Sequence, residues 1–329
     1  ASNNTAVGYT ALSANTTGTS NTAMGYNSLT SNTTASNNTS IGYASLEAIT
    51  TGGDNTALGY RAGDSLTTGN NNAIVGRSAL SSDTLGDRAV AIGSGALATQ
   101  NFTSSTDNYN VGIGFNAGAL ITTGVSNTLI GGLAGDSLTD ADFNVALGYF
   151  ALGGDTKGNK TTAIGVGALE SQNFTSPTDT YNTALGYQAG KLVTTGTLNT
   201  LIGGLAGDAI TTATDNTAVG YAALTATTTG AENTAVGSLA LATNTTGASN
   251  TAFGRASLNA NTTASYNTAY GTDTLQVNTT GANNTATGYR ALFVNTTGAQ
   301  NTASGVRALG GNTTGGDNTA MGYEALRLN

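Results

Sequence analysis

The sequence predicts an all-β protein, a single parallel β-solenoid of about 19 coils built from a 17-residue repeat. Three observations carry this prediction. The glycine of an Asn-Thr-Ala-X-Gly motif returns every 17 residues, apart from two longer steps of 21. Asn, Thr and Gly are abundant and form helices poorly, so a helical repeat is disfavoured. Each repeat has only two or three large apolar side chains, so neighbouring repeats must stack to make a core.

Numbered from the Asn of the motif, the repeat reads Asn-Thr-Ala-φ-Gly-X-X-Ala-Leu-X-X-Asn-Thr-Thr-Gly-X-X, where φ is apolar. Repeat position 1 is Asn in all but two coils, and position 5 is always Gly. In the first four coils these residues are Asn4, Asn21, Asn38 and Asn55, and Gly8, Gly25, Gly42 and Gly59. We expect a short strand before position 5, and bends at the glycines of positions 5 and 15 that exclude a Cβ atom.

Charge is missing from one set of repeat positions. None of the ten basic and eighteen acidic residues stands at positions 1 to 5, 8 or 9. Charged side chains are rarely buried, so we expect these positions to be inside or tightly packed. Positions 2 and 4 would then share the inward face of the strand. The small residues at positions 3 and 8 would allow close approach between coils.

A second pattern concerns the volume of the core. Five coils have Gly instead of Leu at position 9, and the same coils have a large aliphatic residue at position 12. The pairs are Gly63 with Leu66, Gly118 with Ile121, Gly135 with Leu138, Gly190 with Val193, and Gly207 with Ile210. Cores tolerate swaps that conserve volume better than voids, so positions 9 and 12 are expected to fill one interior space.

Stacked coils place equivalent residues in columns. Parallel pairing at about 4.8 Å per coil predicts a rod on the order of 90 Å long. The asparagines of positions 1 and 12 are expected to form hydrogen-bonded amide ladders. Aromatic rings at position 6 are expected to stack along the rod. They include Tyr9, Tyr26, Tyr43 and Tyr60 in successive coils, and later Tyr149 and Tyr187.

We expect residues 1–329 to form one continuous solenoid domain with two inserted loops, near 99–107 and 171–179. The loops belong to related segments, QNFTSSTDNYN and QNFTSPTDTYN, and their common phase predicts that both bulge from one side. Exposed loops on rigid scaffolds often bind partners, which makes Phe102 and Phe174 candidate contact residues. The alternative is that the loops have no binding role. The six tyrosines named above are candidates for a seam between chains or a sugar-binding strip.

Composition argues against several classes of function. The chain has no His and no Cys, so familiar catalytic triads, zinc sites and disulfides are not expected, and neither an enzyme nor a cofactor or metal site is predicted. A net charge of -8 disfavours nucleic-acid binding. No apolar run approaches the roughly 20 residues of a membrane span, so membrane insertion is not expected. Asp54, Asp215 and Asp317 at position 17 are expected to be solvated turn residues rather than calcium ligands.

The cores NTAVG, TSIG and NVGIG, each followed by a small residue and Leu or Gly, resemble the head repeats of trimeric autotransporter adhesins. They are also similar to the NTAxGYxAL and NTTG arrays of bacteriophage tail fibres and bacterial surface fibres. The resemblance implies a left-handed β-roll, often trimeric, displayed outside a cell or on a virion. The chain departs from the adhesin pattern in its longer coil and its added NTTG corner.

The sequence therefore predicts a structural or adhesive fibre protein located outside the cell, on the cell surface or on a virion. Its expected partners are further copies of itself, as a trimer or an end-to-end filament, and a cell-surface glycan or host receptor. Without distinct polar caps, the chain is expected to be a segment of a longer fibre or a rod that stacks end to end. The alternative is an ice- or lattice-binding solenoid that uses the Thr columns of positions 13 and 14.

Overall fold

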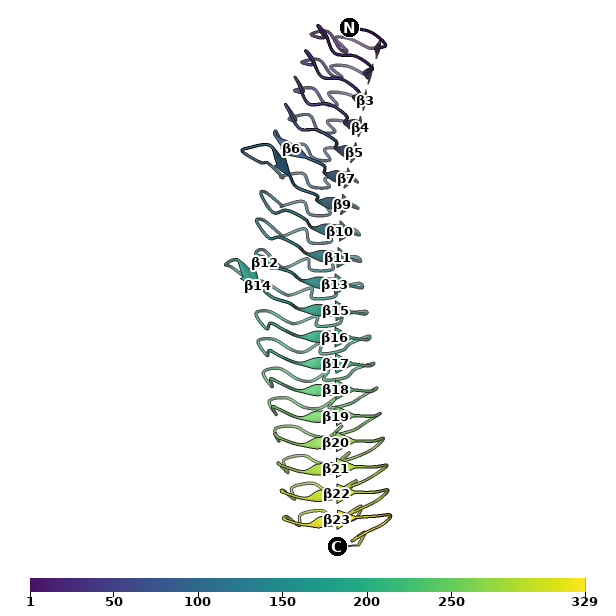
Figure 1. The fold of residues 1–329 in the computed structure, drawn as a ribbon, viewed down its shortest axis with the longest axis vertical. Coiled ribbons are helices and arrows are strands. Elements are labelled where there is room, and N and C mark those ends of the chain that lie inside the picture. Colours follow the sequence, from purple (N-terminus) through teal and green to yellow (C-terminus); the bar gives the residue numbers. More distant parts are fainter. Residues whose placement is uncertain (329) are drawn as a thin grey trace. The chain divides into compact units, whose positions relative to one another are not determined.

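The computed structural model describes residues 1–328 and confirms the parallel β-solenoid. Two compact units are present, one of residues 1–161 with 173–179 and one of 162–172 with the chain from 180 onward. Each unit is a stack of coils with one short strand at the same place in every coil (Figure 1). Residues 1–328 contain no helix, and so none that is long and apolar enough to span a membrane. That residues 1–329 form one continuous domain stays a prediction.

The first unit contains nine three-residue strands and the second contains ten, which gives the predicted 19 coils. In the first unit they are β1 (Thr5–Val7), β2 (Thr22–Met24), β3 (Thr39–Ile41), β4 (Thr56–Leu58), β5 (Ala73–Val75), β7 (Val90–Ile92), β9 (Val111–Ile113), β10 (Thr128–Ile130) and β11 (Val145–Leu147). In the second they are β13 (Thr162–Ile164), β15 (Thr183–Leu185), β16 (Thr200–Ile202), β17 (Thr217–Val219), β18 (Thr234–Val236), β19 (Thr251–Phe253), β20 (Thr268–Tyr270), β21 (Thr285–Thr287), β22 (Thr302–Ser304) and β23 (Thr319–Met321).

Successive strands within each unit pair in parallel and in register. Thr217, Ala218 and Val219 of β17 lie beside Thr234, Ala235 and Val236 of β18. The backbone N–H of each position 2 donates to the carbonyl of position 1 in the next coil, as from Thr234 to Asn250 at 2.8 Å. A shift of one residue would exchange the two faces of every strand, so the repeat fixes the register.

The inward face of the strands is not the predicted one. Position 3 is buried, as Ala218 and Ala235 show, whereas positions 2 and 4 point outward and are half-buried or exposed. Successive residues of a strand face opposite sides, so an inward position 3 forces its neighbours outward. The interior is filled by the Leu of position 9, and the small residues of positions 3 and 8 leave room for it. These small residues therefore line the core and do not mediate approach between coils.

Four positions per coil, 5, 7, 9 and 17, have positive φ angles. At position 5 the φ angles lie between 122° and 144°, a region open only to glycine. A Cβ atom on Gly220 would also come within 2.7 Å of the Gly237 backbone in the next coil. The prediction holds only in part for position 15: a Cβ atom on Gly18 would lie 2.2 Å from the Ala35 carbonyl oxygen, but no positive φ occurs at this position and Ala35 itself is accommodated. Asp215, at position 17, is an exposed turn residue with φ 60°.

The asparagines of position 1 form the predicted ladder, and Asn250 illustrates its bonding. Its Oδ1 accepts the backbone N–H of Asn267 in the next coil at 3.0 Å. Its Nδ2 donates to Asn233 Oδ1 in the previous coil at 3.1 Å and to the Ala264 carbonyl at 2.8 Å. The side chain is fully buried. Each amide therefore satisfies a backbone group in its own coil and another in the next.

A second ladder runs along position 12, and a third was not predicted. Asn261 Nδ2 donates to Asn244 Oδ1 at 2.9 Å and to the Ala264 carbonyl at 3.0 Å. The Ala264 carbonyl thus accepts from two amide columns. At position 13 the Thr245 hydroxyl donates to the Thr262 carbonyl at 3.0 Å, and the Thr245 backbone N–H donates to the same oxygen at 2.8 Å. These ladders bind coil to coil without a large core.

Only two coils lack Asn at position 1, those of Ala89 and Thr161, and both carry an insert. Without an amide at position 1, the backbone N–H of position 1 in the following coil would have no acceptor. In the first case Asn108 Oδ1 accepts the Asn110 N–H at 2.9 Å, and in the second Thr180 Oγ1 accepts the Asn182 N–H at 3.2 Å. Each insert therefore replaces the missing amide of its own coil.

The structure confirms that side chains of positions 9 and 12 fill the same interior space. Side chains of position 3 also reach into it. Gly118 has φ 60°, and a Cβ atom there would lie 2.7 Å from Leu129 Cδ1 and 3.1 Å from Ile121 Cδ1. Leu129 takes the place of the usual Ala at position 3 in the following coil. All of these side chains are fully buried. In the coils with Gly at position 9, the space that Leu fills elsewhere is thus filled from positions 3 and 12.

The ladder can be tested with Asn250→Ala. This change leaves the Asn267 N–H buried without an acceptor, and such a group destabilises a protein by about 1–3 kcal/mol. We expect a lower denaturant midpoint by circular dichroism. The matched control is Thr251→Ala, on the outward position 2 where Ala73 stands naturally, and it should change the midpoint little. An equal loss from both variants would contradict a structural role for the amide.

The shared volume can be tested with Gly118→Ala and Leu129→Ala. The first overpacks the core by about 1–3 kcal/mol, and the second leaves a cavity that destabilises by about 2–5 kcal/mol. The double variant should lose less stability than the two single losses added together, because the new methyl group occupies the space that Leu129 vacates. Denaturant titration of all four proteins measures this coupling. Additive losses would show that the two residues do not share a space.

Candidate functional site

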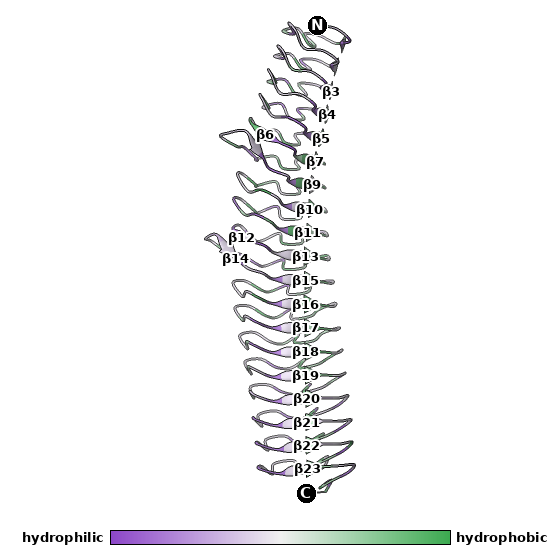
Figure 2. Cartoon of the chain, viewed as in Figure 1, coloured by the Kyte–Doolittle hydropathy of each residue, from purple (hydrophilic) through white to green (hydrophobic). Residues whose placement is uncertain are grey.

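The outer face of the strands carries exposed aliphatic residues at position 4. Leu58, Leu147 and Leu185 expose 46%, 44% and 44% of their surface. The strands β7, β9 and β11 also have Val at position 2, and they are hydrophobic along much of their length (Figure 2). Neither position carries a charge in any coil. Sequence reasoning missed this surface because it took the absence of charge as a sign of the interior.

The predicted tyrosine stack forms in the first four coils. The rings of Tyr9, Tyr26, Tyr43 and Tyr60 lie 5.1–5.2 Å apart between centroids, within 14° of parallel. All four are exposed. The guanidinium of Arg61 lies 6.0 Å from the centroid of the Tyr60 ring, at the last ring of this stack.

Later tyrosines do not continue the stack. Tyr187 is exposed, but Val166 and Gly204 occupy position 6 in the coils on either side of it. Tyr149 instead lies near Phe150, with centroids 6.2 Å apart. A second stack that was not predicted joins Phe253 and Tyr270 of position 4, at 5.0 Å. Rings therefore stack where adjacent coils have an aromatic residue at the same repeat position.

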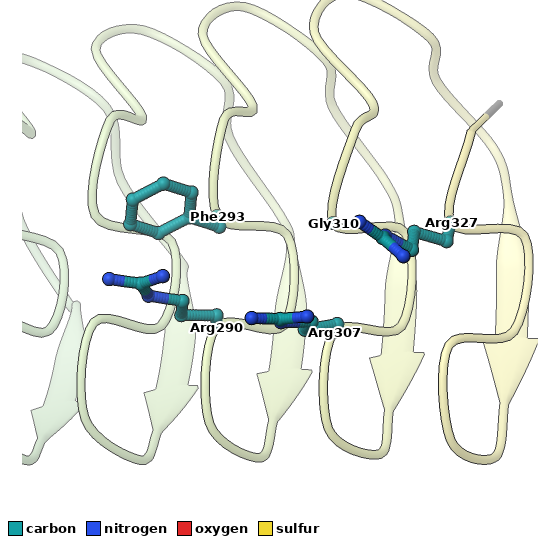
Figure 3. Close-up of a pocket in the computed structure, with 5 residues that line it drawn as sticks. All are labelled: Arg290, Phe293, Arg307, Gly310 and Arg327. Atoms are coloured by element: carbon teal, nitrogen blue, oxygen red, sulfur yellow. The ribbon is translucent and has the colours of Figure 1, made fainter.

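One hollow of about 200 Å³ lies outside all the predicted site residues. It is lined by Arg290, Phe293, Arg307, Gly310 and Arg327, which come from three successive coils of the second unit (Figure 3). No motif in the sequence marks it, because its residues stand at repeat positions 7 and 10, whose composition varies from coil to coil.

The two inserts add short strand pairs to the first unit. Strand β6 (Gly86–Asp87) pairs with β8 (Thr106–Asp107), and β12 (Gly158–Asn159) pairs with β14 (Thr178–Asp179). Both protrude on the same side of that unit, as predicted (Figure 1). Each is fastened by an exposed ion pair across the strands, between Arg88 and Asp107 and between Lys160 and Asp179.

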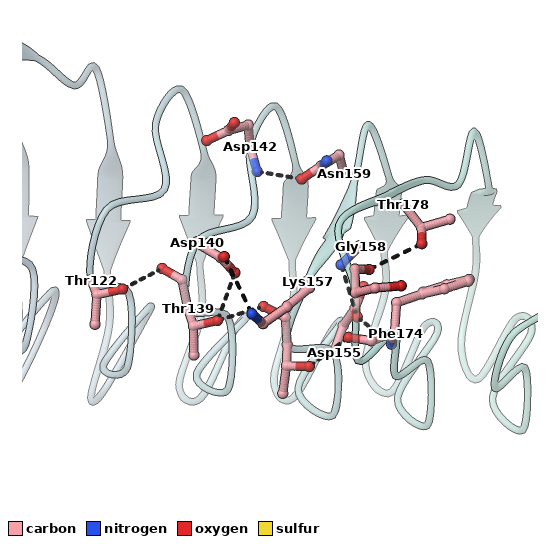
Figure 4. A network of polar contacts seen from close by, with 12 residues as sticks. Thr122, Thr139, Asp140, Asp142, Asp155, Lys157, Gly158, Asn159, Phe174 and Thr178 are labelled. Carbon is pink, nitrogen blue, oxygen red and sulfur yellow. Dashed lines mark hydrogen bonds and ion pairs between the residues drawn. The ribbon is translucent and has the colours of Figure 1, made fainter.

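Phe102 and Phe174 do not project from the inserts. They expose only 5% and 7% of their surface, so they are anchors and not contact residues. A buried carboxylate lies beneath each one. Asp155 Oδ1 accepts the backbone N–H groups of Phe174 at 3.0 Å and of Gly158 at 3.2 Å (Figure 4). The backbone N–H of each phenylalanine is thus held by a carboxylate inside the coil, which accompanies the inward position of its ring.

Asp83 holds the first insert in the same way. Its Oδ2 accepts from Gln100 Nε2 at 2.6 Å and its Oδ1 from the Gly86 N–H at 3.0 Å. Burial raises the pKa of Asp83 above the ordinary 3.8, although these hydrogen bonds act in the opposite direction. No group of three or more His, Cys, Asp or Glu residues that could hold a metal ion occurs within residues 1–328.

Comparison with known proteins gives no family. No protein-family model matches the chain, and no curated protein matches it.

The raised pKa of Asp83 predicts a pH dependence of stability. The folded state binds the proton more tightly than the unfolded chain, so stability should fall as pH rises from about 4 through the folded pKa. Asp83→Asn removes this titration, and its melting temperature should depend less on pH between about pH 4 and pH 7. The control Asp215→Asn changes an exposed turn carboxylate and should keep the slope of the unmodified protein. A slope unchanged in Asp83→Asn would contradict this assignment.

Proposed function

We propose that this chain is a structural and adhesive fibre element that self-associates laterally through the outer face of its strands. The observation that carries the proposal is the outward-facing, uncharged column of position 4, which is exposed or half-buried. Soluble proteins normally place polar and charged residues on the outward face of a sheet. Here Leu58 and Leu147 occupy that face, and the neighbouring position 2 offers only Thr, Val or Ala.

The occupant that fits this face is a second copy of the chain. Its side chains recur once per coil, at the spacing of parallel strands, so a partner must repeat with the same period to contact them all. A second copy of the chain has the same repeat and therefore the same period. Symmetric oligomers of identical chains are also the commonest assemblies, and a trimer would bring three such faces together. End-to-end stacking uses other surfaces and is compatible with lateral contact.

The interior supports a role that demands durability. Backbone and side-chain ladders tie each coil to the next, and the chain has no thiol that could be oxidised or exchanged. These properties suit a rod displayed outside a cell or on a virion, where a glycan or host receptor is the expected further partner.

A lattice-binding surface is the second candidate, and one observation favours it. Position 2 points outward and is Thr in most coils, whereas the Thr245 hydroxyl of position 13 already donates to a backbone carbonyl. A paired Thr-X-Thr face occurs in β21, at Thr285 and Thr287. Elsewhere position 4 is mostly aliphatic, which suits protein contact better. Thermal hysteresis of a monomeric preparation would favour the lattice instead.

Self-association can be tested with Leu147→Glu and Leu185→Glu. Each side chain points away from the core, so the fold should persist, while a charge buried between chains should weaken assembly at least about tenfold. Sedimentation velocity over a concentration series measures the mass. Gln276→Glu is the control, because Glu47 and Glu170 stand at the same repeat position 10. A monomeric unmodified protein at every concentration, or variants that assemble as well as it does, would overturn the proposal.

A further inference from the structure

The hollow of the second unit owes its existence to one glycine. Repeat position 10 holds Phe293, Gly310 and Arg327 in three successive coils, and in nearly every other coil it holds a side chain. Gly310 therefore leaves a gap in the column between Phe293 and Arg327. Arg290 and Arg307 form a second row at position 7, below this gap (Figure 3). The result is a cavity of about 200 Å³ bordered by three guanidinium groups.

Basic groups outnumber carboxylates around this cavity. Four of the ten basic residues of the chain lie within residues 250–328, in a protein whose net charge is -8. They are Arg255, Arg290, Arg307 and Arg327. Two carboxylates, of Asp273 and Glu324, face these four groups. A third acidic residue, Asp317, stands at position 17, on another corner of the coil.

The two carboxylates do not saturate the guanidinium groups. Glu324 Oε1 is shared by Arg307 Nη1 at 3.4 Å and Arg327 Nη1 at 3.2 Å. Asp273 is shared in the same way, with Arg255 Nη2 at 2.8 Å and Arg290 Nε at 3.5 Å. A guanidinium has five N–H donors, so most donors of the three cavity residues remain available to a further acceptor.

Aromatic rings hold one of the guanidinium groups in place. That of Arg290 lies 4.8 Å from the centroid of the Phe293 ring and 5.1 Å from that of the Tyr289 ring. Stacking of this kind holds the plane of the Arg290 guanidinium in one orientation with little further loss of side-chain entropy on binding. The backbone adds to this order, because Arg290 and Arg307 both sit at positive φ, 55° and 57°, which sets the direction in which each side chain leaves the coil.

We infer that this cavity binds an oxyanion, a carboxylate, sulfate or phosphate group held by the forked donors of Arg307 and Arg327 with Arg290 beside them. Bidentate contact between guanidinium and oxyanion is among the strongest hydrogen-bonded pairings in proteins. The volume accommodates one acidic group and part of what carries it, rather than a whole large ligand. Two sources share this chemistry, an acidic saccharide and a free inorganic anion. The saccharide source rests on the proposed adhesive function, whereas anion binding itself does not.

The test measures binding of sodium sulfate, D-glucuronate and neutral D-glucose to the full chain by isothermal titration calorimetry at low ionic strength. Sulfate and glucuronate should bind saturably and weaken with added salt, whereas glucose should not bind. Arg307→Ala and Arg327→Ala should each weaken binding at least about tenfold. Gly310→Gln fills the gap with a side chain that position 10 accepts at Gln276, and it should abolish binding while keeping all three arginines.

Arg61→Ala is the matched control. Arg61 stands at the same repeat position 7 and pairs with Asp64 at 3.5 Å, but it does not line the cavity beside Gly310, so its removal should leave anion binding there unchanged. Tighter binding of glucuronate than of sulfate would assign the site to an acidic sugar, and the reverse order to an inorganic anion. Measuring the assembly-deficient Leu147→Glu variant as well separates this inference from self-association. Absence of saturable binding, or binding that survives Gly310→Gln, would overturn it.

Discussion

The side-chain amide of repeat position 1 is the interaction on which the rest of the structure depends. Its Oδ1 accepts a backbone N–H of the next coil, and its Nδ2 donates to the carbonyl of position 15 in its own coil, as at Asn233 with Asn250 and Gly247. Both groups are buried. The Asn250 N–H would otherwise lack an acceptor, and the Gly247 carbonyl would keep only its second donor, Asn244 Nδ2 at 2.9 Å. One residue per coil therefore fixes the distance between coils and the closure of each coil together. A change of period would break both contacts, which explains why the step stays at 17 wherever no insert supplies a substitute.

The inserts show how this constraint is kept when the period changes. Four extra residues lengthen the coils of Ala89 and Thr161, and those coils alone lack the amide. The insert returns an acceptor to the same N–H through Asn108 or Thr180, and Gln100 accepts from the Asn110 amide at 2.9 Å. The ladder is thus rerouted rather than interrupted. Insertions elsewhere in the coil would have no such compensation, which limits where the scaffold can be elaborated.

Much of the fold could be predicted from the sequence because a fixed period constrains a stack strongly. The strand positions, the amide ladders, the exchange of Gly118 with Ile121 and the first tyrosine stack all follow from columns of equivalent residues. The phase of the strand could not be predicted in this way. The exclusion of charge from positions 2 and 4 is compatible with a face inside the coil and with one covered by another chain. The structure decides between these two alternatives, because Ala218 is buried and Leu185, on the other face of the strands, is exposed.

The candidate sites were harder to predict because they depend on departures from the repeat. Phe102 stood out in an inserted loop, yet its burial follows from a backbone contact to Asp83 that no spacing reveals. The cavity beside Gly310 lies at two variable positions, and its three arginines, Arg290 and Arg307 at position 7 and Arg327 at position 10, come together because their coils are stacked. A repetitive scaffold makes every coil equivalent, so a specific site must arise where a single coil differs. In this chain a missing side chain at position 10, flanked by unbalanced charge, is such a difference.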